Sequence, residues 1–352
     1  MTRRRLLTAE VAEIRAALLG FYRRHRRDLP WRRTRDPYAI WVSEIMLQQT
    51  QVATVLPRYA EFLREFPTVA ALAAAKESRV CEAWAGLGYY RRARNLHRAA
   101  QRVLAQRGGE MPGTVAELQT LPGIGRYTAG AIASIAFDEP APIVDGNVRR
   151  LLSRLYAIDL SGSSDAVLWK RAAELVQGES PGDLNQALME MGALVCTPRG
   201  PDCVDCPVRG WCNALATGTP ERFPVRKEPA PSKRLLVSFA WIASPRGVWL
   251  AQRSLEGLWA GLWELPSASG PNARQLLETR LGMRLVGPKA RFRHQLTHRD
   301  VRVSVWVPAT SKRAARLRLK RTATCKPVIH PLEAPLSAVA RKAIVAMLRD
   351  DG

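Results

Sequence analysis

Apolar residues recur every three or four positions through most of the first 215 residues of the chain. The run Leu7, Val11, Ile14, Leu18 and Phe21 is an example, and this period is typical of one buried helix face. From Thr8 to about Leu215 the pattern therefore predicts nearly unbroken helix. Breaks are expected at Pro30, Pro57, Pro67, the Gly108-Gly109 pair, Pro122, Pro140 and Pro181.

The pattern changes beyond residue 216. Four prolines and mixed charges between Gly218 and Pro231 indicate an extended linker. After it, strand-like segments and one amphipathic helix predict an α+β domain. The strand runs are Leu235–Ala243 and Val248–Gln252, joined by a predicted hairpin turn at 244–247, and Arg302–Val307; the helix is Leu336–Leu348. We expect a helical domain over 1–216, a linker over 217–234 and a second domain over 235–352.

The chain is strongly basic, with 54 Lys and Arg against 31 Asp and Glu and a formal charge of +23. The basic residues lie among Trp, Leu and Ile, so they belong to a folded protein and point to a polyanionic partner. A cationic surface without a specific partner remains the alternative. No apolar run reaches the length of a membrane span or signal segment, so we expect a soluble, cytoplasmic protein that contacts no membrane.

Four of the six cysteines lie within seventeen residues. Cys196, Cys203, Cys206 and Cys212 are spaced C-x6-C-x2-C-x5-C, which indicates a metal site in a reducing compartment and not a disulfide framework. From spacing alone, an iron–sulfur cluster and a zinc ion are equally favoured. We interpret Cys81 and Cys325 as ordinary thiols.

A glycine-rich turn, Leu121-Pro-Gly-Ile-Gly125, separates two helical patterns. Gly123 and Gly125 permit a tight turn whose backbone N–H groups, at the start of the second helix, suit a phosphate oxygen. Such a contact holds a nucleic-acid backbone without reading its sequence. An ordinary helical hairpin explains the same pattern.

Two carboxylates stand out by their positions. Asp145 lies where an apolar run gives way to a helix, so it is expected to cap that helix and to stay ionised beside free N–H groups. Glu44 lies in a helical segment among Ile40, Trp41 and Ile45, and such apolar surroundings should raise its pKa. The alternatives are a purely structural cap and a solvated helix glutamate.

Together these motifs resemble those of a known family. The Leu121-Pro-Gly-Ile-Gly turn followed by Val144-Asp-Gly-Asn-Val-Arg-Arg150 resembles the helix-hairpin-helix DNA glycosylases. Two further motifs, Trp41-Val-Ser-Glu-Ile-Met-Leu-Gln-Gln-Thr-Gln-Val and Trp84-Ala-Gly-Leu-Gly-Tyr-Tyr, narrow the resemblance to the MutY family, which removes adenine opposite 8-oxoguanine. The resemblance implies a mainly α domain with its hairpin at about 114–137 and an iron–sulfur cluster loop at 196–212, followed by a MutT-like (Nudix-like) α+β domain.

The resemblance also implies catalytic roles. Glu44 aligns with the general acid that protonates N7 of adenine, and Asp145 with the ionised partner of the oxocarbenium-like sugar. Asn147, from the same motif as Asp145, joins the implied catalytic set. Tyr127 stands where strand-cutting relatives of the endonuclease III type carry a nucleophilic lysine, and Arg149 is too basic to replace it. We therefore expect base excision without a β-lyase step.

Substrate contacts follow from the same resemblance. An extruded adenine needs a pocket, and the gap that it leaves in the duplex needs a wedge. Gln49 and Tyr89 are the implied wedge residues, and Gly123, Gly125 and Arg126 are the implied backbone contacts of the hairpin. The implied lining of the adenine pocket is Trp31, Arg32, Leu47, Gln186 and Met189.

For the cysteines, the resemblance implies one [4Fe–4S] cluster bound by Cys196, Cys203, Cys206 and Cys212. The cluster is expected to be structural and to fix a loop that presents Arg199 and Arg209 to phosphate.

The second domain is expected to bind and not to hydrolyse. A Nudix hydrolase needs an Arg-Glu-x-x-Glu-Glu helix to hold Mg²⁺, and the stretch Arg274–Thr279 lacks two of its three carboxylates. The resemblance implies an 8-oxoguanine recognition loop at Leu296, Thr297 and His298, where Leu296 replaces a more familiar Phe. The run Lys312–Arg321 holds six basic residues and is expected to touch phosphate, although a solvated loop is almost as well supported.

The sequence thus predicts a monomeric, monofunctional glycosylase acting on double-stranded DNA that carries A:8-oxoG or A:G mispairs. In the cell it would associate with the nucleoid through DNA. Two alternatives remain: a related glycosylase for thymine in T:G mispairs, and a non-catalytic DNA-binding protein that uses the hairpin and the charge.

Overall fold

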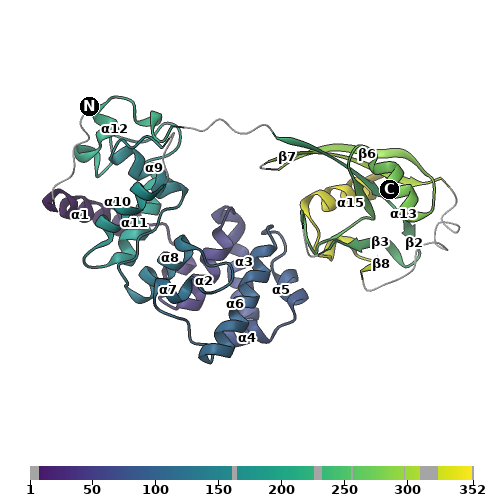
Figure 1. Cartoon of the computed structure of the whole chain (residues 1–352), viewed down its shortest axis with the longest axis horizontal. Helices are drawn as coiled ribbons and strands as arrows, with labels where there is room; N and C mark the ends of the chain where they lie inside the picture. The colour runs from purple at the N-terminus through teal and green to yellow at the C-terminus, as the bar shows by residue number, and fades with distance from the viewer. Residues whose placement is uncertain are drawn as a thin grey trace. The chain divides into compact units, whose positions relative to one another are not determined.

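The computed structural model describes residues 8–160, 165–225, 232–254, 257–296, 298–309 and 324–350. The chain divides into two compact units, one formed by Met1–Glu77 with Arg94–Glu228 and the other by Ser78–Ala93 with Pro229–Gly352. Helices make up the first unit, and the described strands all belong to the C-terminal part of the chain (Figure 1). Thr297 and the run Lys312–Arg321 lie outside the described residues. In the described part of the chain, no helix combines the length and apolar character that crossing a membrane requires.

The predicted helices of residues 8–216 are present. They are α1 (Thr8–His25), α2 (Pro37–Leu47), α3 (Val52–Glu65), α4 (Val69–Ala74), α5 (Glu77–Ala83), α6 (Arg91–Arg107), α7 (Val115–Leu118), α8 (Arg126–Phe137), α9 (Gly146–Leu155), α10 (Ala166–Val176), α11 (Pro181–Leu194) and α12 (Asn213–Ala216), with short 3-10 turns η1 (Pro30–Arg32), η2 (Arg209–Trp211) and η3 (Pro220–Arg222). Helix α2 is central to its unit, because every residue from Tyr38 to Met46 is buried. Asp36 caps this helix by accepting from the backbone N–H groups of Tyr38 and Ala39.

One predicted break is wrong. Pro57 lies inside α3 and does not end it. Proline removes one backbone hydrogen bond, but Val55, Tyr59 and Phe62 of the same helix are buried. Tertiary packing of this apolar face outweighs the local preference against helix.

The glycine turn connects α7 to α8 as predicted. Gly123 has φ +82°, and a Cβ at this position would lie 2.6 Å from Cβ of Asn95 on α6. A side chain is therefore excluded both by backbone conformation and by space. Gly125 is the N-cap residue of α8, and Thr128 to Ile135 of that helix are buried. The hairpin is thus anchored in the core through its second helix.

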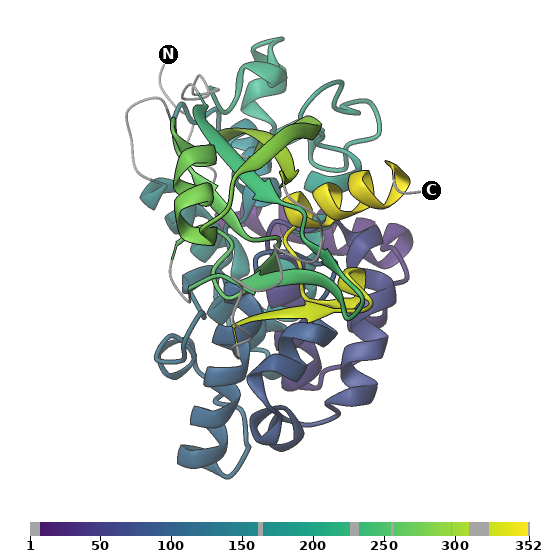
Figure 2. The ribbon, with the colours of Figure 1, turned by 90° about the vertical axis from the view of Figure 1, so that its right-hand side faces the viewer.

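The second unit contains two sheets. One has the order β5-β1-β7-β6, with β1 and β7 parallel, and the other has β2-β3-β4 with β8 paired to β3. The strands are β1 (Lys233–Ala240), β2 (Ala243–Ser244), β3 (Gly247–Gln252), β4 (Trp263–Glu264), β5 (Ser267–Ser269), β6 (Leu285–Leu296), β7 (Arg299–Pro308) and β8 (Cys325–Val328); α13 (Ala273–Leu281), η4 (Pro331–Glu333) and α15 (Ala338–Asp350) complete the unit. Figure 2 shows the green α13 and the yellow α15 on opposite sides of the strands.

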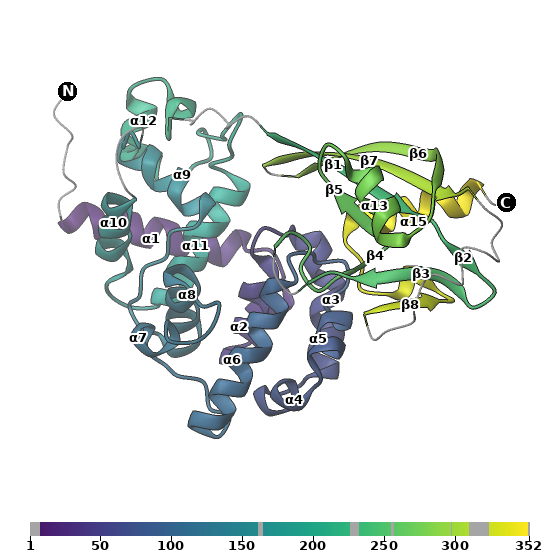
Figure 3. The same cartoon turned by 45° about the vertical axis from the view of Figure 1, so that its right-hand side comes forward.

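The α+β prediction is confirmed, with one correction to the hairpin. The predicted strand over 235–243 is divided between β1 and β2, and only the short β2 pairs with β3 across the turn at 245–246. Strand β1 pairs with β5 and β7 in the other sheet instead. Val237 and Phe239 of β1 belong to the core cluster that also contains the buried face of α15. Figure 3 shows β1, β5, β6 and β7 together in one sheet.

Candidate active site and cysteine cluster

Glu44 lies on α2, and only 6% of it is exposed. Burial raises the pKa of its carboxyl to about 7, a hydrogen bond with Tyr127 opposes that shift, and the charge of Asp145 adds to it. The apolar neighbourhood predicted this direction. Near neutral pH Glu44 can therefore hold or release a proton, as a general acid must.

Tyr127 on α8 interacts with both carboxyls. Burial raises its pKa well above the usual value, and the negative charges of Glu44 and Asp145 raise it further. Its hydroxyl also lies 3.2 Å from Sδ of Met189 on α11, within hydrogen-bonding distance of that sulfur. The phenol consequently stays protonated and joins α2, α8 and α11.

Asp145 caps α9, as predicted, and its Oδ1 accepts from the backbone N–H of Val148 at 2.7 Å. Burial nevertheless raises its pKa, whereas the sequence indicated only the charge-favouring effect of the helix terminus. The backbone N–H groups of Val148 and Asn147, the charge of Arg150 and the side chain of Asn147 oppose the rise. The two carboxyls thus differ in environment, because Asp145 accepts from a helix terminus whereas Glu44 lies within the buried helix α2.

Asn147 lies on α9 and, through Arg150 of the same helix, connects Asp145 to α11 and to the cysteine loop. Its amide donates to Oδ2 of Asp145 at 3.3 Å, and its Oδ1 accepts from Arg150 at 3.0 Å. Arg150 also donates to the carbonyl oxygens of Gly192 and Cys196, at 2.5 and 2.6 Å. A Cβ on Gly192 would lie 2.6 Å from Cβ of Asn147, so only glycine permits this close packing of α9 on α11.

Glu190 is a residue that sequence reasoning missed. It lies on α11, is fully buried and accepts two-pronged hydrogen bonds from Arg27 and Arg32 at 2.7–3.0 Å. Burial alone would raise the pKa of Glu190, but these hydrogen bonds overcome that effect and hold it at about 2. The sequence feature that could have identified it is a lone glutamate, next to Met189, in the otherwise apolar stretch Ala187–Leu194.

The predicted pocket residues come from η1, the end of α2 and one face of α11. Gln186 accepts from the Tyr22 hydroxyl at 2.9 Å, and the Arg32 guanidinium lies 5.5 Å from the centre of the same tyrosine ring. Trp31 is buried edge-to-face against Tyr59, with ring centres 5.3 Å apart. Leu47 is the last residue of α2 and is half-buried. The polar members of this set are therefore held in place by protein partners.

The residues predicted to face DNA make fewer contacts with other protein side chains than the predicted pocket residues do. Gln49 and Tyr89 both have the left-handed backbone that L-residues rarely adopt, with φ of 56° and 46°, and both side chains are exposed. Arg126 is exposed, and its guanidinium lies 3.9 Å from the centre of the Trp169 ring. Leu296 is half-buried against the core under α15, whereas His298 is exposed.

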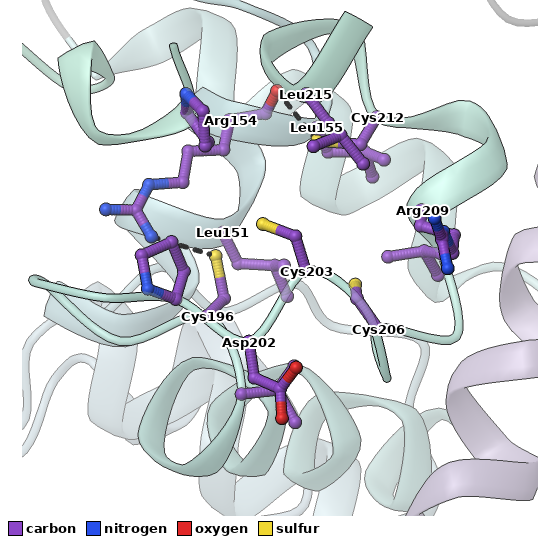
Figure 4. Close-up of a pocket in the computed structure, with 14 residues that line it drawn as sticks. Leu151, Arg154, Leu155, Cys196, Asp202, Cys203, Cys206, Arg209, Cys212 and Leu215 are labelled. Carbon is purple, nitrogen blue, oxygen red and sulfur yellow. Dashed lines mark hydrogen bonds between the residues drawn. The ribbon is translucent and has the colours of Figure 1, made fainter. Parts of the chain in front are cut away.

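The four clustered cysteines line one pocket between α9 and the loop that follows α11 (Figure 4). Arg154 of α9 is buried beside them, donates to Sγ of Cys196 at 3.3 Å and accepts from Sγ of Cys212 through its carbonyl at 3.6 Å. Burial raises the pKa of the Cys206 thiol to about 11 and also raises that of Cys203 and Cys212. The thiols converge on one space under a buried cation, which suits a negatively charged group bound by thiolates.

The four thiols are ligands that both a zinc ion and an iron–sulfur cluster accept. Among the residues that the structure describes, no set of three or more His, Cys, Asp or Glu side chains is arranged to hold a single metal ion.

Comparison with known proteins agrees with this architecture. Residues 42–176 match the model of the HhH-GPD superfamily base excision DNA repair proteins, and residues 238–346 match a NUDIX domain. A solved thermostable thymine-DNA glycosylase is 30% identical, with a TM-score of 0.55, and covers 59% of this chain and 98% of its own. A trapped endonuclease III-DNA intermediate, 22% identical with a TM-score of 0.53 and covering 61% and 99% of the two chains, shares the fold of the helical part.

Curated relatives extend the match across both domains. The human adenine DNA glycosylase is 43% identical over 76% of this chain and 60% of its own length, and the mouse protein is 40% identical over 74% and 61%. This chain thus spans about three fifths of these relatives. The adenine DNA glycosylase of Buchnera aphidicola from Baizongia pistaciae is 32% identical over 80% of this chain and 82% of its own. The chain belongs to the adenine DNA glycosylase family.

Proposed function

We propose that this protein is a monofunctional DNA glycosylase that hydrolyses the N-glycosidic bond of adenine paired with 8-oxoguanine, and also of adenine in A:G. Membership of the family supports the activity. The observation that carries the mechanism is a pair of carboxyls, Glu44 buried and Asp145 half-buried, that both interact with Tyr127. Glu44 has a pKa of about 7. Two carboxyl groups in unlike environments are the arrangement that glycosidic cleavage uses.

In this mechanism Glu44 donates its proton to N7 of the extruded adenine. The protonated base leaves, and the positive charge that develops on the sugar is stabilised by the Asp145 carboxylate. Val148 and Asn147 hold that carboxylate in place with their N–H groups. Water then adds to the anomeric carbon of the sugar cation, and its proton passes to the Glu44 carboxylate, which restores the acid.

A strand-cutting step is not part of the proposal. Schiff-base chemistry needs an amine nucleophile, and Tyr127 supplies a phenol that stays protonated. The guanidinium of Arg149 is paired with Asp165 at 3.0 Å and is too basic to attack the sugar. Base release should therefore exceed nicking of abasic DNA.

For recognition, we propose Trp31, Arg32, Leu47, Gln186 and Met189 as the adenine pocket and Gln49 and Tyr89 as wedge residues. The loop between β6 and β7 would read 8-oxoguanine through His298 and its neighbours Leu296 and Thr297. The domain would bind without hydrolysing, because Glu278, the carboxylate of α13, already accepts from Arg274 and from the backbone N–H of Leu285.

We also propose one [4Fe–4S] cluster held by Cys196, Cys203, Cys206 and Cys212. The cluster would supply iron–thiolate bonds that fix the loop carrying Arg199 and Arg209, and the hydrolysis itself uses only the carboxyls and water. Aerobically purified protein should be yellow-brown and contain iron and sulfide in equal amounts. A colourless protein that binds one zinc ion per chain would contradict the assignment.

One experiment tests activity and specificity together. Single-turnover excision is measured on duplexes with A:8-oxoG, A:G, T:G and A:T pairs at two salt concentrations. We expect excision of adenine from the first two. Preferential release of thymine from T:G would favour the function named for the solved thymine-DNA glycosylase, and binding without release from any duplex would favour a DNA-binding role.

A further inference from the structure

One face of the sheet β5-β1-β7-β6 carries a group of arginines that the proposed chemistry does not use. Alternate residues of β7 point to opposite faces, so Val301, Val303 and Val305 pack with α15 while Arg302, Ser304 and Trp306 lie on the other side. The strand register places Arg293 opposite Arg302 and Arg291 opposite Ser304. With Arg274 of α13, these arginines line a pocket of about 550 Å³; we call it the arginine pocket.

The charges of the arginine pocket are not balanced. Asp300 is shared between Arg293 at 2.6 Å and Arg302 at 3.7 Å, and Glu278 pairs with Arg274. Arg291 is exposed, and no ion pair or hydrogen bond of its side chain occurs within the described ranges. Arginines kept close together without matching carboxylates repel one another, so this face favours an anionic ligand.

The geometry favours a strand backbone over a free nucleotide. The Cα atoms of residues two apart on β6, such as Arg291 and Arg293, are about 6.8 Å apart along the strand. This distance is comparable to that between successive phosphorus atoms of an extended nucleic-acid strand. The Arg293 and Arg302 side chains are 68% and 52% exposed, as expected for contacts at the rim of a solvated backbone. Two aromatic residues line the pocket. Arg274 covers the Trp306 ring at 4.8 Å, and Phe292 packs against the core under α15 with Lys342 at 4.8 Å from its ring centre, so neither ring offers an open platform for stacking a base.

We propose that the arginine pocket binds the phosphodiester backbone of DNA as a contact surface separate from the β6–β7 loop. Arg291 and Arg302 are the main contacts, and guanidinium groups suit phosphate because of their planar fork of donors. The inference rests on the proposed function only in taking DNA as the partner. It assigns to the second unit a hold on DNA that is independent of the lesion.

The test compares Arg291→Gln and the double variant Arg291→Gln/Arg302→Gln with Arg246→Gln in the full-length protein. Arg246 is an exposed arginine in the β2–β3 turn and lies outside the pocket, so it is a matched control. Binding to duplex DNA is titrated over a series of salt concentrations. The slope of log K against log salt should become shallower by about 1 for the single variant and by about 2 for the double variant, with no change for the control.

The other outcomes are equally informative. Equal slopes for Arg291→Gln and the wild type, or an equal loss for Arg246→Gln, would overturn the proposal. Tight binding of dGMP or pyrophosphate that Arg291→Gln abolishes, with DNA binding unchanged, would assign the pocket to a free nucleotide and also overturn it. Because Arg291 is exposed, the single variant should fold normally. If the double variant proves unstable, the salt slope of the single variant alone decides the test. Excision is scored separately, so failure of the glycosylase assignment would appear in the wild type and would leave the salt slopes interpretable.

Discussion

The amide of Asn147 donates to Oδ2 of Asp145 at 3.3 Å, while Arg150 holds the amide oxygen of the same asparagine. Truncating the Asn147 side chain to that of alanine would remove one donor from the half-buried Asp145 carboxylate. A hydrogen bond to a charged group contributes about 1.5–3 kcal/mol, so we expect Asn147→Ala to slow single-turnover excision by roughly 10- to 100-fold. The pKa of Asp145 should rise as well. An unchanged rate would show that Val148 alone positions the carboxylate.

Glu44→Gln should abolish excision and leave mispair binding largely intact, because an amide N–H is far too weakly acidic to transfer its proton to N7. In the wild type, the pKa of about 7 predicts a rate that falls about tenfold per pH unit above neutrality. Single-turnover rates across a pH series measure this. Measurable turnover by Glu44→Gln, or a flat profile above pH 7, would remove Glu44 from the mechanism.

The raised pKa of Glu44 also affects folding. Between its ordinary value of 4.5 and about 7 the folded state binds a proton that the unfolded state has lost. Stability therefore falls as pH rises through that window, by an amount on the order of 3 kcal/mol. Denaturant titrations of the wild type and Glu44→Gln should converge at low pH and separate towards neutral pH.

Asp145→Asn separates capping from chemistry. Asparagine is as good an N-cap as aspartate, so the fold and the melting temperature should be nearly unchanged. The variant loses the negative charge that stabilises the sugar cation, so excision should fall by several orders of magnitude. Loss of folding with normal chemistry in the remaining folded protein would instead assign Asp145 a structural role only.

Glu190→Gln should destabilise the protein by about 3–5 kcal/mol, because it leaves Arg27 and Arg32 without their shared buried carboxylate. Glu61→Gln is the matched control, since Glu61 pairs with Arg58 on the exposed surface and should contribute less than about 1 kcal/mol. The pKa of Glu190, about 2, lies below its ordinary value of 4.5. Its stabilising effect is therefore fully present above pH 4.5 and is lost as pH falls towards 2. Similar losses of unfolding free energy in Glu190→Gln and Glu61→Gln would contradict a special stabilising role for the buried ion pairs of Glu190.

Gly192→Ala should slow excision more than it lowers stability. The added methyl would lie 2.6 Å from Cβ of Asn147, so α9 and with it Asp145 must shift. Gly20→Ala is the control, because the same addition in α1 meets no atom closer than 3.5 Å. Comparing single-turnover rates and melting temperatures of the two variants tests the steric argument. Normal excision by Gly192→Ala would show that the packing adapts without moving Asp145.

Much of this architecture could be predicted from local sequence. The glycines of the hairpin, the cap at Asp145 and the apolar surroundings of Glu44 each depend on residues close in the chain. The buried position of Glu190 could not, because its partners Arg27 and Arg32 lie about 160 residues away. The raised pKa of Asp145 and the partners of β1 were missed for the same reason, since both depend on burial by distant elements.

The left-handed backbone of Gln49 and Tyr89 has a consequence for how stability is distributed. A non-glycine residue in this conformation destabilises the fold by about 1–3 kcal/mol. Neither side chain recovers that energy in the core, because neither is buried. The backbone at each of these two positions is therefore locally less stable than an ordinary right-handed or extended conformation would be. If the two act as wedges, the protein trades thermodynamic stability for side chains that already project outward before DNA arrives.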